Sequence, residues 1–353
     1  GENVVIHGES CCIYLHDSRT GRKPCYMTFD GFKLAGFDEY GISVSECDHI
    51  TLSSNTIAVN DNYDYGIRIY GTSSTGYCDS IMIYNNMIHG EMRYGIYLKY
   101  TPNAELYFNS IYNYTSSSFS GSYGIYSISP NSYDVPAAIM NNAVDNDCGG
   151  NDVAVYFSSA YELPVQMDYN VWYDQDANFG KIDNTYYSDI DNWREDTARD
   201  AHSHNITPSF AGQTDLHIRD YSICQSTGVT VSGITEDSDN DTREDPPDIG
   251  ADENRNTPCF GFDGTYTINN TNPTDWPGGT NFQSFMDAKT ALEDCYLNGT
   301  TVFEVYDDGG PYNEIIGGSY GFNQIDGASA DNRLIFREAD SEKVVIHGKS
   351  CCI

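Results

Sequence analysis

The chain has few basic residues and no long apolar run, and each shortage excludes a class of partner. Lys and Arg together number 18 of 353 residues, against 52 Asp and Glu, which gives a formal net charge of −34. Such an imbalance repels phosphate backbones and anionic lipid surfaces, so nucleic acid is not expected as a partner. No stretch of about 18 apolar residues is present, so we also expect no insertion into a membrane.

Long helical patterns are almost absent as well. Gly, Asn and Ser are abundant, and the chain contains 29 Tyr. This composition is typical of short strands separated by many turns. The sequence therefore predicts an all-β chain.

The two ends of the sequence repeat one another. Residues 1–13 read GENVVIHGESCCI and residues 341–353 read SEKVVIHGKSCCI, with ten of the thirteen positions identical. A fixed long period indicates a repeat array. We interpret the sequence as a window on a tandem protein, or on identical units joined head to tail, with a period of 340 residues.

A shorter repeat lies between residues 40 and 172. The phrases YGISV, YGIRI, YGIYL, YGIYS and VAVYF follow one another at intervals of 25, 29, 29 and 30 residues. Each leads to a second apolar patch, and the fourth position of that patch forms a ladder of short polar side chains. The ladder consists of Asp30, Asn55, Asn86, Asn109, Asn142 and Asn170.

Repeats of this length leave no room for a crossover helix and suit one coil of a right-handed parallel β-helix, a solenoid. Alternation places Ile67 and Ile69 inside and Arg68 outside. We expect the ladder at a corner, where Asn tolerates left-handed backbone angles and bonds to the same amide one coil away. The other corner is expected at Gly41, Gly66, Gly95 and Gly124.

After residue 180 the ladder gives way to a different succession of phrases. Residues 208–210 (PSF), residues 216–228 and residues 248–253 (DIGADE) follow in that order. This succession resembles the closing segment of bacterial secreted and cell-surface right-handed β-helix proteins. The resemblance implies a module that ends near residue 253, in a class that includes adhesins, surface-layer components and carbohydrate-active enzymes.

The residues from Pro258 onward resemble the opening segment of the same proteins. A helix is expected over Thr280–Leu297, as part of a small α/β cap that covers the first coil. Its apolar stripe is expected to consist of Phe282, Phe285, Met286, Leu292 and Cys295. The expected domains are residues 1–255, the coils and closing segment of one module, and residues 256–353, the cap and first coils of the next.

The cysteines have no CxxC spacing of the kind that binds zinc. Together with the acidic composition, this favours an oxidising setting, with the protein secreted or at the cell surface. A bridge between Cys259 and Cys295 is predicted to fix the cap, at about 3 to 4 kcal/mol in the loop-entropy model. Cys11, Cys12, Cys25 and Cys47 lie near consecutive early coils and are candidates for another bridge.

The phrase DSDNDTRE is the one candidate for metal binding. It places Asp237, Asp239 and Asp241 at alternate positions, the spacing by which a loop directs several oxygens at one Ca²⁺. It lacks the Gly and the terminal Glu of an EF-hand. Two interpretations remain open at this point, a calcium site and a solvated acidic turn.

Signatures of catalysis are missing. The sequence contains no HExxH, GxSxG or P-loop pattern. A polysaccharide lyase needs a basic residue beside carboxylates, and a glycosidase needs two facing carboxylates. The outward strand positions instead read Ser43, Arg68, Tyr97 and Tyr126.

The leading interpretation is therefore not an enzyme but a structural tandem-repeat module of an extracellular fibre or adhesin, which requires no cofactor. The alternative is a carbohydrate-binding or carbohydrate-cleaving surface protein, in which exposed tyrosines such as Tyr97, Tyr100 and Tyr126 stack on glycans.

The last residues bear on assembly. Val344, Val345 and Ile346 would leave an unpaired apolar strand edge if nothing followed them. We predict that residues 343–353 pack as residues 3–13 do, against a following module or an identical neighbour.

Overall fold

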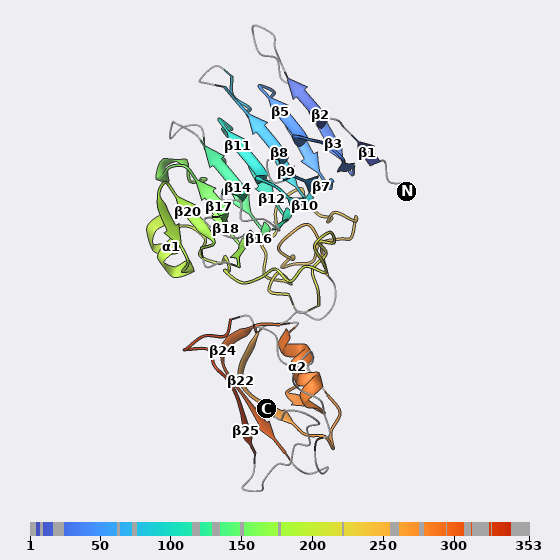
Figure 1. Ribbon diagram of the computed structural model, residues 1–353, viewed down its shortest axis with the longest axis vertical. Coiled ribbons are helices and arrows are strands. Elements are labelled where there is room, and N and C mark those ends of the chain that lie inside the picture. The colour runs from blue at the N-terminus through green and yellow to red at the C-terminus, as the bar shows by residue number, and fades with distance from the viewer. Residues whose placement is uncertain are drawn as a thin grey trace. The chain divides into compact units, whose positions relative to one another are not determined.

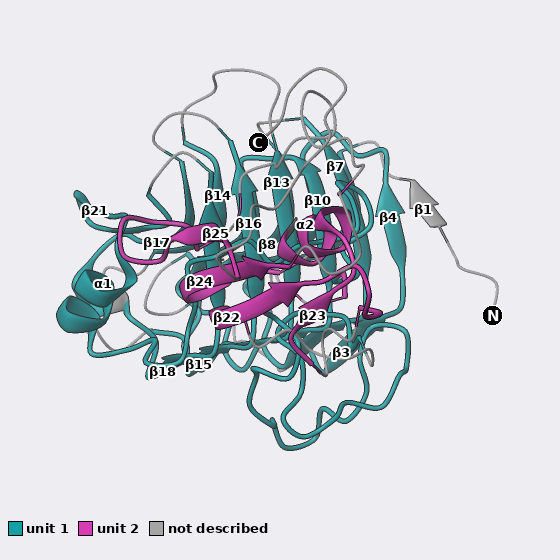
Figure 2. Ribbon diagram, turned by 90° about the horizontal axis from the view of Figure 1, so that it is seen from below, with its two compact units in different colours: residues 1–218, 224–254 teal, residues 219–223, 255–353 magenta. Residues whose placement is uncertain are grey.

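The computed structural model shows a chain built mainly of strands (Figure 1). It describes residues 5–7, 10–16, 25–61, 64–72, 76–114, 121–128, 135–148, 152–175, 178–220, 222–254, 261–274, 279–293, 295–306, 312, 325 and 327–339. The chain divides into two compact units, coloured separately in Figure 2: residues 1–218 with 224–254, and residues 219–223 with 255–353.

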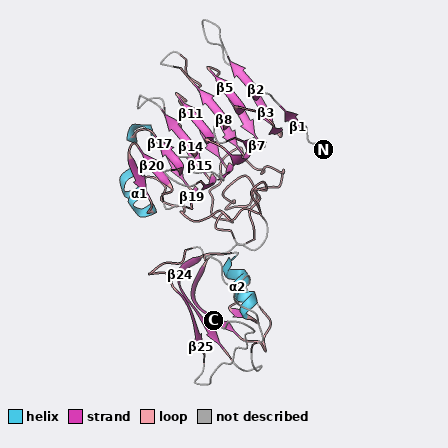
Figure 3. Ribbon diagram, viewed as in Figure 1, coloured by secondary structure: helices cyan, strands magenta, loops and turns pink. Residues whose placement is uncertain are grey.

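The first unit is a parallel β-solenoid, which confirms the expected all-β solenoid fold (Figure 3). Successive strands belong to three sheets in the repeating order A, B, C, so each coil gives one strand to each sheet. Sheet A contains β1 (Val5–His7), β4 (Lys33–Ala35), β7 (Thr56–Asn60), β10 (Met87–Glu91), β13 (Ser110–Tyr114), β16 (Ala143–Asp147) and β19 (Val171–Asp174).

The other two sheets complete the coils. Sheet B contains β2 (Cys11–His16), β5 (Tyr40–Ser45), β8 (Tyr65–Tyr70), β11 (Tyr94–Lys99), β14 (Tyr123–Ile128), β17 (Val153–Phe157), β20 (Gly180–Ile182) and β21 (Thr185–Tyr187). Sheet C contains β3 (Met27–Asp30), β6 (Ile50–Ser53), β9 (Met82–Tyr84), β12 (Glu105–Tyr107), β15 (Ala138–Met140) and β18 (Gln166–Asp168).

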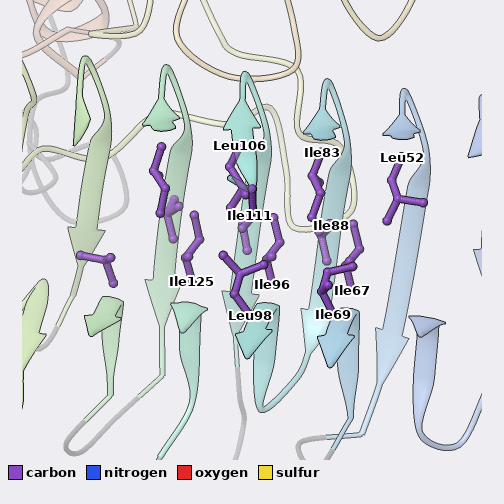
Figure 4. Packing of buried hydrophobic residues seen from close by; sticks show 14 of the residues in the cluster. Leu52, Ile67, Ile69, Ile83, Ile88, Ile96, Leu98, Leu106, Ile111 and Ile125 are labelled. Atoms are coloured by element: carbon purple, nitrogen blue, oxygen red, sulfur yellow. The ribbon is translucent and has the colours of Figure 1, made fainter. Parts of the chain in front are cut away.

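The interior of the solenoid is filled by aliphatic side chains in rows. The repeated phrases pair in register, so Ile67 lies beside Ile96 and Ile96 beside Ile125. All three are fully buried, and Figure 4 shows such residues following one another from coil to coil. Complete burial of a side chain of this size contributes roughly 1.5 to 3 kcal/mol. The repeat therefore stabilises the fold by burying the same position in every coil.

The glycines of these phrases do not turn a corner, which corrects the prediction made for them. Each lies second in its strand of sheet B, as Gly95 does in β11. A Cβ on Gly95 would lie 2.6 Å from the carbonyl oxygen of Gly124 and 2.7 Å from Cγ2 of Ile111. Glycine is needed here because sheet A packs closely against sheet B, while the next coil accommodates Ala154 at this position.

The corner between sheets C and A uses left-handed backbone angles, but one residue earlier than expected. The residue before each ladder asparagine has a positive φ, and so does the equivalent residue of the first coil, Gly31; the full set is Gly31, Ser54, Asn85, Phe108, Asn141 and Tyr169. The ladder asparagines themselves have no positive φ. The corner residue turns the chain, and the next residue is then free to point its side chain along the solenoid.

The C-terminal end of the solenoid is closed. Helix α1 (Ile190–Thr197) begins at Asp189, whose carboxylate accepts the backbone N–H of Asp191 at 2.7 Å. Trp193 of this helix is fully buried, with its ring 5.1 Å from that of Tyr187 and 5.6 Å from that of Phe179. The helix thus covers apolar rings that would otherwise face solvent. A short 3₁₀ helix, η1 (Ala160–Glu162), precedes β18.

The second unit is a smaller α/β structure. Its parallel sheet contains β23 (Asn281–Phe282), β22 (Phe262–Ile268), β24 (Leu297–Val305) and β25 (Leu334–Glu338), in that order. Helix α2 spans Phe285–Glu293 and is shorter than the expected Thr280–Leu297. Phe282 belongs to a strand and Cys295 follows the helix. The buried face of α2 is formed by Phe285, Ala288, Ala291 and Leu292. No helix in the described parts of the chain is long and apolar enough to cross a membrane.

Candidate functional site

The ladder asparagines form one hydrogen-bonded column inside the solenoid. The Oδ1 atom of Asn109 accepts both the backbone N–H and the Nδ2 group of Asn86, at 3.2 and 3.0 Å. Asn109 in turn donates from both groups to Oδ1 of Asn142, at 3.1 and 2.9 Å. Asn55 and Asn170 extend the same arrangement on either side.

Each ladder side chain also bonds to the backbone of the coil before it. Nδ2 of Asn109 donates to the carbonyl of Ile83 at 2.9 Å, and Asn109 is fully buried. The amide therefore satisfies backbone groups at a corner where strand pairing is interrupted. Its role is structural.

Asp30 does not belong to this column, so the prediction for it is wrong. Met27 pairs with Ile50, which sets Asp30 opposite Ser53 and leaves the ladder position to Phe32. The backbone N–H of Phe32 donates to Oδ1 of Asn55 at 3.0 Å. The prediction for Asp30 treats residues 27–32 (MTFDGF) as the equivalent of the later apolar patches. This equivalence is two residues out of register, because Met27 is an exposed residue at the start of its strand.

The outer face of sheet B carries a continuous row of aromatic rings, here called the tyrosine face. It consists of Tyr40, Tyr65, Tyr94, Tyr97, Tyr123, Tyr126 and Tyr156. The rings of Tyr97 and Tyr126 are 5.5 Å apart, and those of Tyr126 and Tyr156 are 4.8 Å apart. These three residues occupy the same outward position in consecutive coils and are half-buried.

Basic side chains lie along the tyrosine face, although the chain has few of them. The guanidinium of Arg68 lies 5.0 Å from the ring centre of Tyr40, and the ammonium of Lys181 lies 4.6 Å from that of Tyr156. Arg68 also donates to Ser43 Oγ at 3.1 Å, which explains why Ser43 is buried. Burial raises the pKa of the Tyr97 phenol, so this ring remains neutral.

A closing segment, residues 205–218 and 224–254, packs on the corners of the solenoid. Arg243 is its anchor, with a side chain that is 3% exposed. The guanidinium of Arg243 pairs with Glu253 at 3.2 Å and lies 3.9 Å from the ring centre of Phe108. Nδ2 of Asn141 donates to the carbonyl of Val229 at 2.8 Å. The corner residues that turn the chain therefore also bind the closing segment.

The predicted calcium ligands are not gathered around one point. Asp237 is buried, and its Oδ1 accepts the backbone N–H groups of Asp239 and Asp241 at 2.9 and 2.8 Å. Its Oδ2 accepts the N–H of Glu253 at 2.9 Å. Asp237 thus holds its own loop together, with both carboxylate oxygens accepting backbone N–H groups.

Asp239 belongs instead to a cluster with His217 and Asp252. The ligand atoms of these three residues lie within 4.8 Å of one another, the one group of this kind that the described residues contain. Oδ2 of Asp239 lies 2.6 Å from Nε2 of His217, and the Asp215 carboxylate contacts Nδ1 of the same ring. Hydrogen bonding to Asp239 raises the pKa of His217 to about 10, and burial raises the pKa of Asp252 to about 6.

A cavity of about 510 Å³ adjoins this cluster. His217 and Asp239 contribute to its wall from the closing segment, while Asp30, Lys33 and Thr56 contribute from the early coils. The cluster is thus open on one side and buried on the other, where Asp252 is 8% exposed.

The early cysteines do not form the predicted bridge. Cys11 and Cys25 are free thiols, and the thiol of Cys12 donates a hydrogen bond to the carbonyl of Ala35 at 3.6 Å. Cys47 is buried in the core of the solenoid. Cys11 and Cys12 are adjacent in strand β2, where alternation points their side chains to opposite faces of the sheet.

Two further predictions fall on residues that the structure does not describe. Cys259 lies outside the described residues, while Cys295, its proposed partner, is buried beside the sheet of the second unit. Val344, Val345 and Ile346 also lie outside them.

His217, Arg243 and Asp252 were not identified from the sequence as a set. They lie, in that order, within residues 216–228, within DSDNDTRE and within DIGADE. Nothing in the spacing of these phrases indicated that they would meet, because irregular segments have no periodicity from which to infer contacts.

Comparison of the chain with protein-family models, with curated proteins and with solved structures gives no match. The parallel β-solenoid and its closing segment are therefore the features from which function has to be inferred.

Proposed function

We propose that the chain is one period of a covalent tandem array of β-solenoid modules, with a structural role in an extracellular fibre or cell-surface adhesin. The observation that carries this proposal is the closed C-terminal end of the solenoid. Together with the 340-residue sequence repeat, it favours modules that are joined through the chain rather than by a continuing sheet.

Every sheet is covered at this end. In sheet B the last parallel strand, β20, pairs with the antiparallel strand β21. In sheet A the backbone N–H of Trp172 donates to the carbonyl of His204 at 2.9 Å, and in sheet C the N–H of Asp200 donates to the carbonyl of Met167 at 2.8 Å. Strand addition needs an open edge, so a second module has little to pair with here.

The test compares the 353-residue chain with a chain that carries one further 340-residue period. Light scattering at high concentration should find the shorter chain monomeric. Urea unfolding of the longer chain should show the same midpoint with a larger amplitude, as expected for modules that fold independently. If the shorter chain instead formed filaments as its concentration was raised, this result would contradict the covalent array. It would favour separate subunits that meet end to end.

The tyrosine face favours a second candidate function, the binding of glycans. A row of half-exposed rings at one position in consecutive coils offers apolar faces at a regular spacing, and phenol groups at its rim donate and accept hydrogen bonds. Arg68 and Lys181 add donors for sugar hydroxyls or carboxylates. A linear polysaccharide fits such a row better than a small molecule does.

Binding to insoluble cellulose and to polygalacturonate would test this function. The wild-type chain should be retained by one of these polymers. The double variant Tyr97→Ala/Tyr126→Ala should bind at least tenfold more weakly, because each stacked ring contributes about 0.5 to 1.5 kcal/mol beyond its apolar burial and about 1.4 kcal/mol is a tenfold change. Tyr161→Ala is the control, since Tyr161 is 77% exposed and lies outside the tyrosine face.

Equal binding by both variants, or no retention of the wild-type chain, would exclude this role. Release of reducing ends during the same incubation would instead indicate a carbohydrate-cleaving enzyme.

A further inference from the structure

We propose that His217, Asp239 and Asp252 form a site for a divalent first-row transition metal, with Zn²⁺ or Co²⁺ as its occupant in vitro. The site is separate from the tyrosine face and lies where the closing segment meets the early coils. One imidazole nitrogen and two carboxylates are a donor set used for such ions, and their two negative charges balance the charge of the cation.

The orientation of His217 is the first argument. Its Nδ1 faces the Asp215 carboxylate, so Nε2 is the nitrogen that points to Asp239 and Asp252. Metal-binding histidines in proteins commonly donate their second ring N–H to a carboxylate, which fixes the ring and its tautomer. Asp215 is placed to act as this positioning residue.

The environment of Asp252 is the second, independent argument. Its side chain is more than nine-tenths buried, and Oδ2 accepts the backbone N–H of Ile218 at 2.8 Å. One of its carboxylate oxygens lies within 4.8 Å of ligand atoms of both His217 and Asp239. A buried carboxylate with one oxygen directed at an exposed histidine is stabilised when a cation lies between them.

The geometry needs only a small adjustment. Nε2 of His217 and Oδ2 of Asp239 are 2.6 Å apart, whereas two ligands of a tetrahedral ion with bonds of about 2.1 Å lie roughly 3.4 Å apart. The Asp239 side chain is 55% exposed and His217 is 46% exposed, so either can move outward by this amount. The adjoining cavity leaves a fourth position for water or for a ligand.

Titration with Co²⁺ tests the site, because the spectrum of the ion reports its ligands. The wild-type chain should bind one Co²⁺ without the intense thiolate charge-transfer bands that ligation by cysteine would give. Binding should raise the melting temperature measured by circular dichroism. Asp252→Asn keeps an oxygen for the Ile218 N–H but removes a ligand, and should weaken Co²⁺ binding at least tenfold. His217→Gln should do the same.

Asp241→Asn is the matched control, because Asp241 lies in the same loop but outside the cluster. It should bind Co²⁺ as the wild type does. Melting in EDTA establishes that each variant is folded before its affinity is compared. The proposal would be overturned by an unchanged Co²⁺ affinity in Asp252→Asn or by a spectrum with thiolate bands. It would also be overturned if the wild type bound Ca²⁺ and Asp241→Asn did not, a result that would favour the loop of alternating Asp residues.

Discussion

Nη2 of Arg243 donates a hydrogen bond to Oδ1 of Asn85 at 2.9 Å, across 158 residues of sequence. Asn85 turns the corner of one coil with a φ of 56° and donates from Nδ2 to the carbonyl of Glu236 at 2.7 Å. One corner residue is therefore bonded to two points of the closing segment. This relationship makes the stability of the solenoid depend on residues that are remote in sequence.

Replacing Arg243 with Met should destabilise the protein strongly. The substitution leaves the Glu253 carboxylate, which is 2% exposed, without its cation. Breaking one side of a buried ion pair typically costs about 3 to 5 kcal/mol. Urea unfolding measures the loss. Arg337→Met is the control, because its pair with Glu304 is half-exposed and should be worth about 0 to 1 kcal/mol. Similar losses in both variants would contradict this account of the anchor.

The asparagine column should be sensitive to truncation in the middle. Asn109→Ala removes an acceptor from the buried N–H and Nδ2 groups of Asn86 and a donor to Ile83. Nδ2 of Asn86 keeps the carbonyls of Leu52 and Tyr84 as acceptors, so the backbone N–H of Asn86 and the carbonyl of Ile83 are the groups that lose this partner. Because a buried group left without a partner costs about 1 to 3 kcal/mol, a total loss of about 2 kcal/mol or more is expected. Asn184→Ala serves as the comparison, since Asn184 is exposed and should change stability by less than about 0.5 kcal/mol. A loss below about 1 kcal/mol in Asn109→Ala would show that water or backbone shifts replace the column.

Gly95 in sheet B should not tolerate even a methyl group, although a later coil carries Ala154 at the equivalent position. In Gly95→Ala the new Cβ meets a carbonyl oxygen and an isoleucine methyl at under 3 Å, and neither can move without displacing a neighbouring coil. A loss of about 2 to 3 kcal/mol is expected in thermal or urea unfolding. Gly212→Ala provides the reference, because nothing lies within 4 Å of its Cβ position. If both variants unfold alike, the packing between sheets A and B is looser than these distances indicate.

Stability should fall as pH rises through the range in which Asp64 titrates. Burial, and then the nearby Asp61, Asp38 and Glu39, raise the pKa of Asp64 to about 7. The unfolded chain releases this proton near pH 4 while the folded chain keeps it, so unfolding is increasingly favoured between about pH 4 and pH 7. Asp64→Asn removes this dependence.

Relative to the wild type, the Asp64→Asn variant should gain up to about 4 kcal/mol in unfolding free energy between about pH 4 and pH 8, because about three pKa units correspond to about 1.4 kcal/mol each. Asp183→Asn, at an exposed position, should keep the wild-type slope. Parallel pH profiles for Asp64→Asn and the wild type would exclude Asp64 as the source of the dependence.

Periodic parts of the fold could be predicted from the sequence, because each coil repeats the environment of the one before it. The inward positions of Ile67 and Ile96 follow from alternation within strands and from the recurrence of one phrase. The register of the first coil could not be obtained in this way, since its patch MTFDGF has exposed residues where later patches are buried. Because Met27 is apolar but exposed, the pattern predicts Asp30 at the ladder position, which in the structure belongs to Phe32.

The candidate metal cluster could not be predicted from the sequence, for a different reason. Asp239 was selected because it alternates with Asp237 and Asp241, a pattern that is local. Its actual neighbours, His217 and Asp252, come from segments with no period, and their approach depends on where Arg243 fixes the loop. Contacts of this kind follow from tertiary packing and not from local pattern.

The closing segment also determines how the module would respond to a pulling force. In a bare solenoid each coil holds only its neighbours, so tension applied at one end would peel coils away singly. Here the segment is bonded to the corners of several coils at once, through Asn85, Ser110 and Asn141. Tension transmitted through residue 254 is therefore shared among these coils and loads their hydrogen bonds in parallel. A tandem array of such modules would lengthen in whole-module steps, each with a high rupture force, and would remain stiff until the first closing segment detaches.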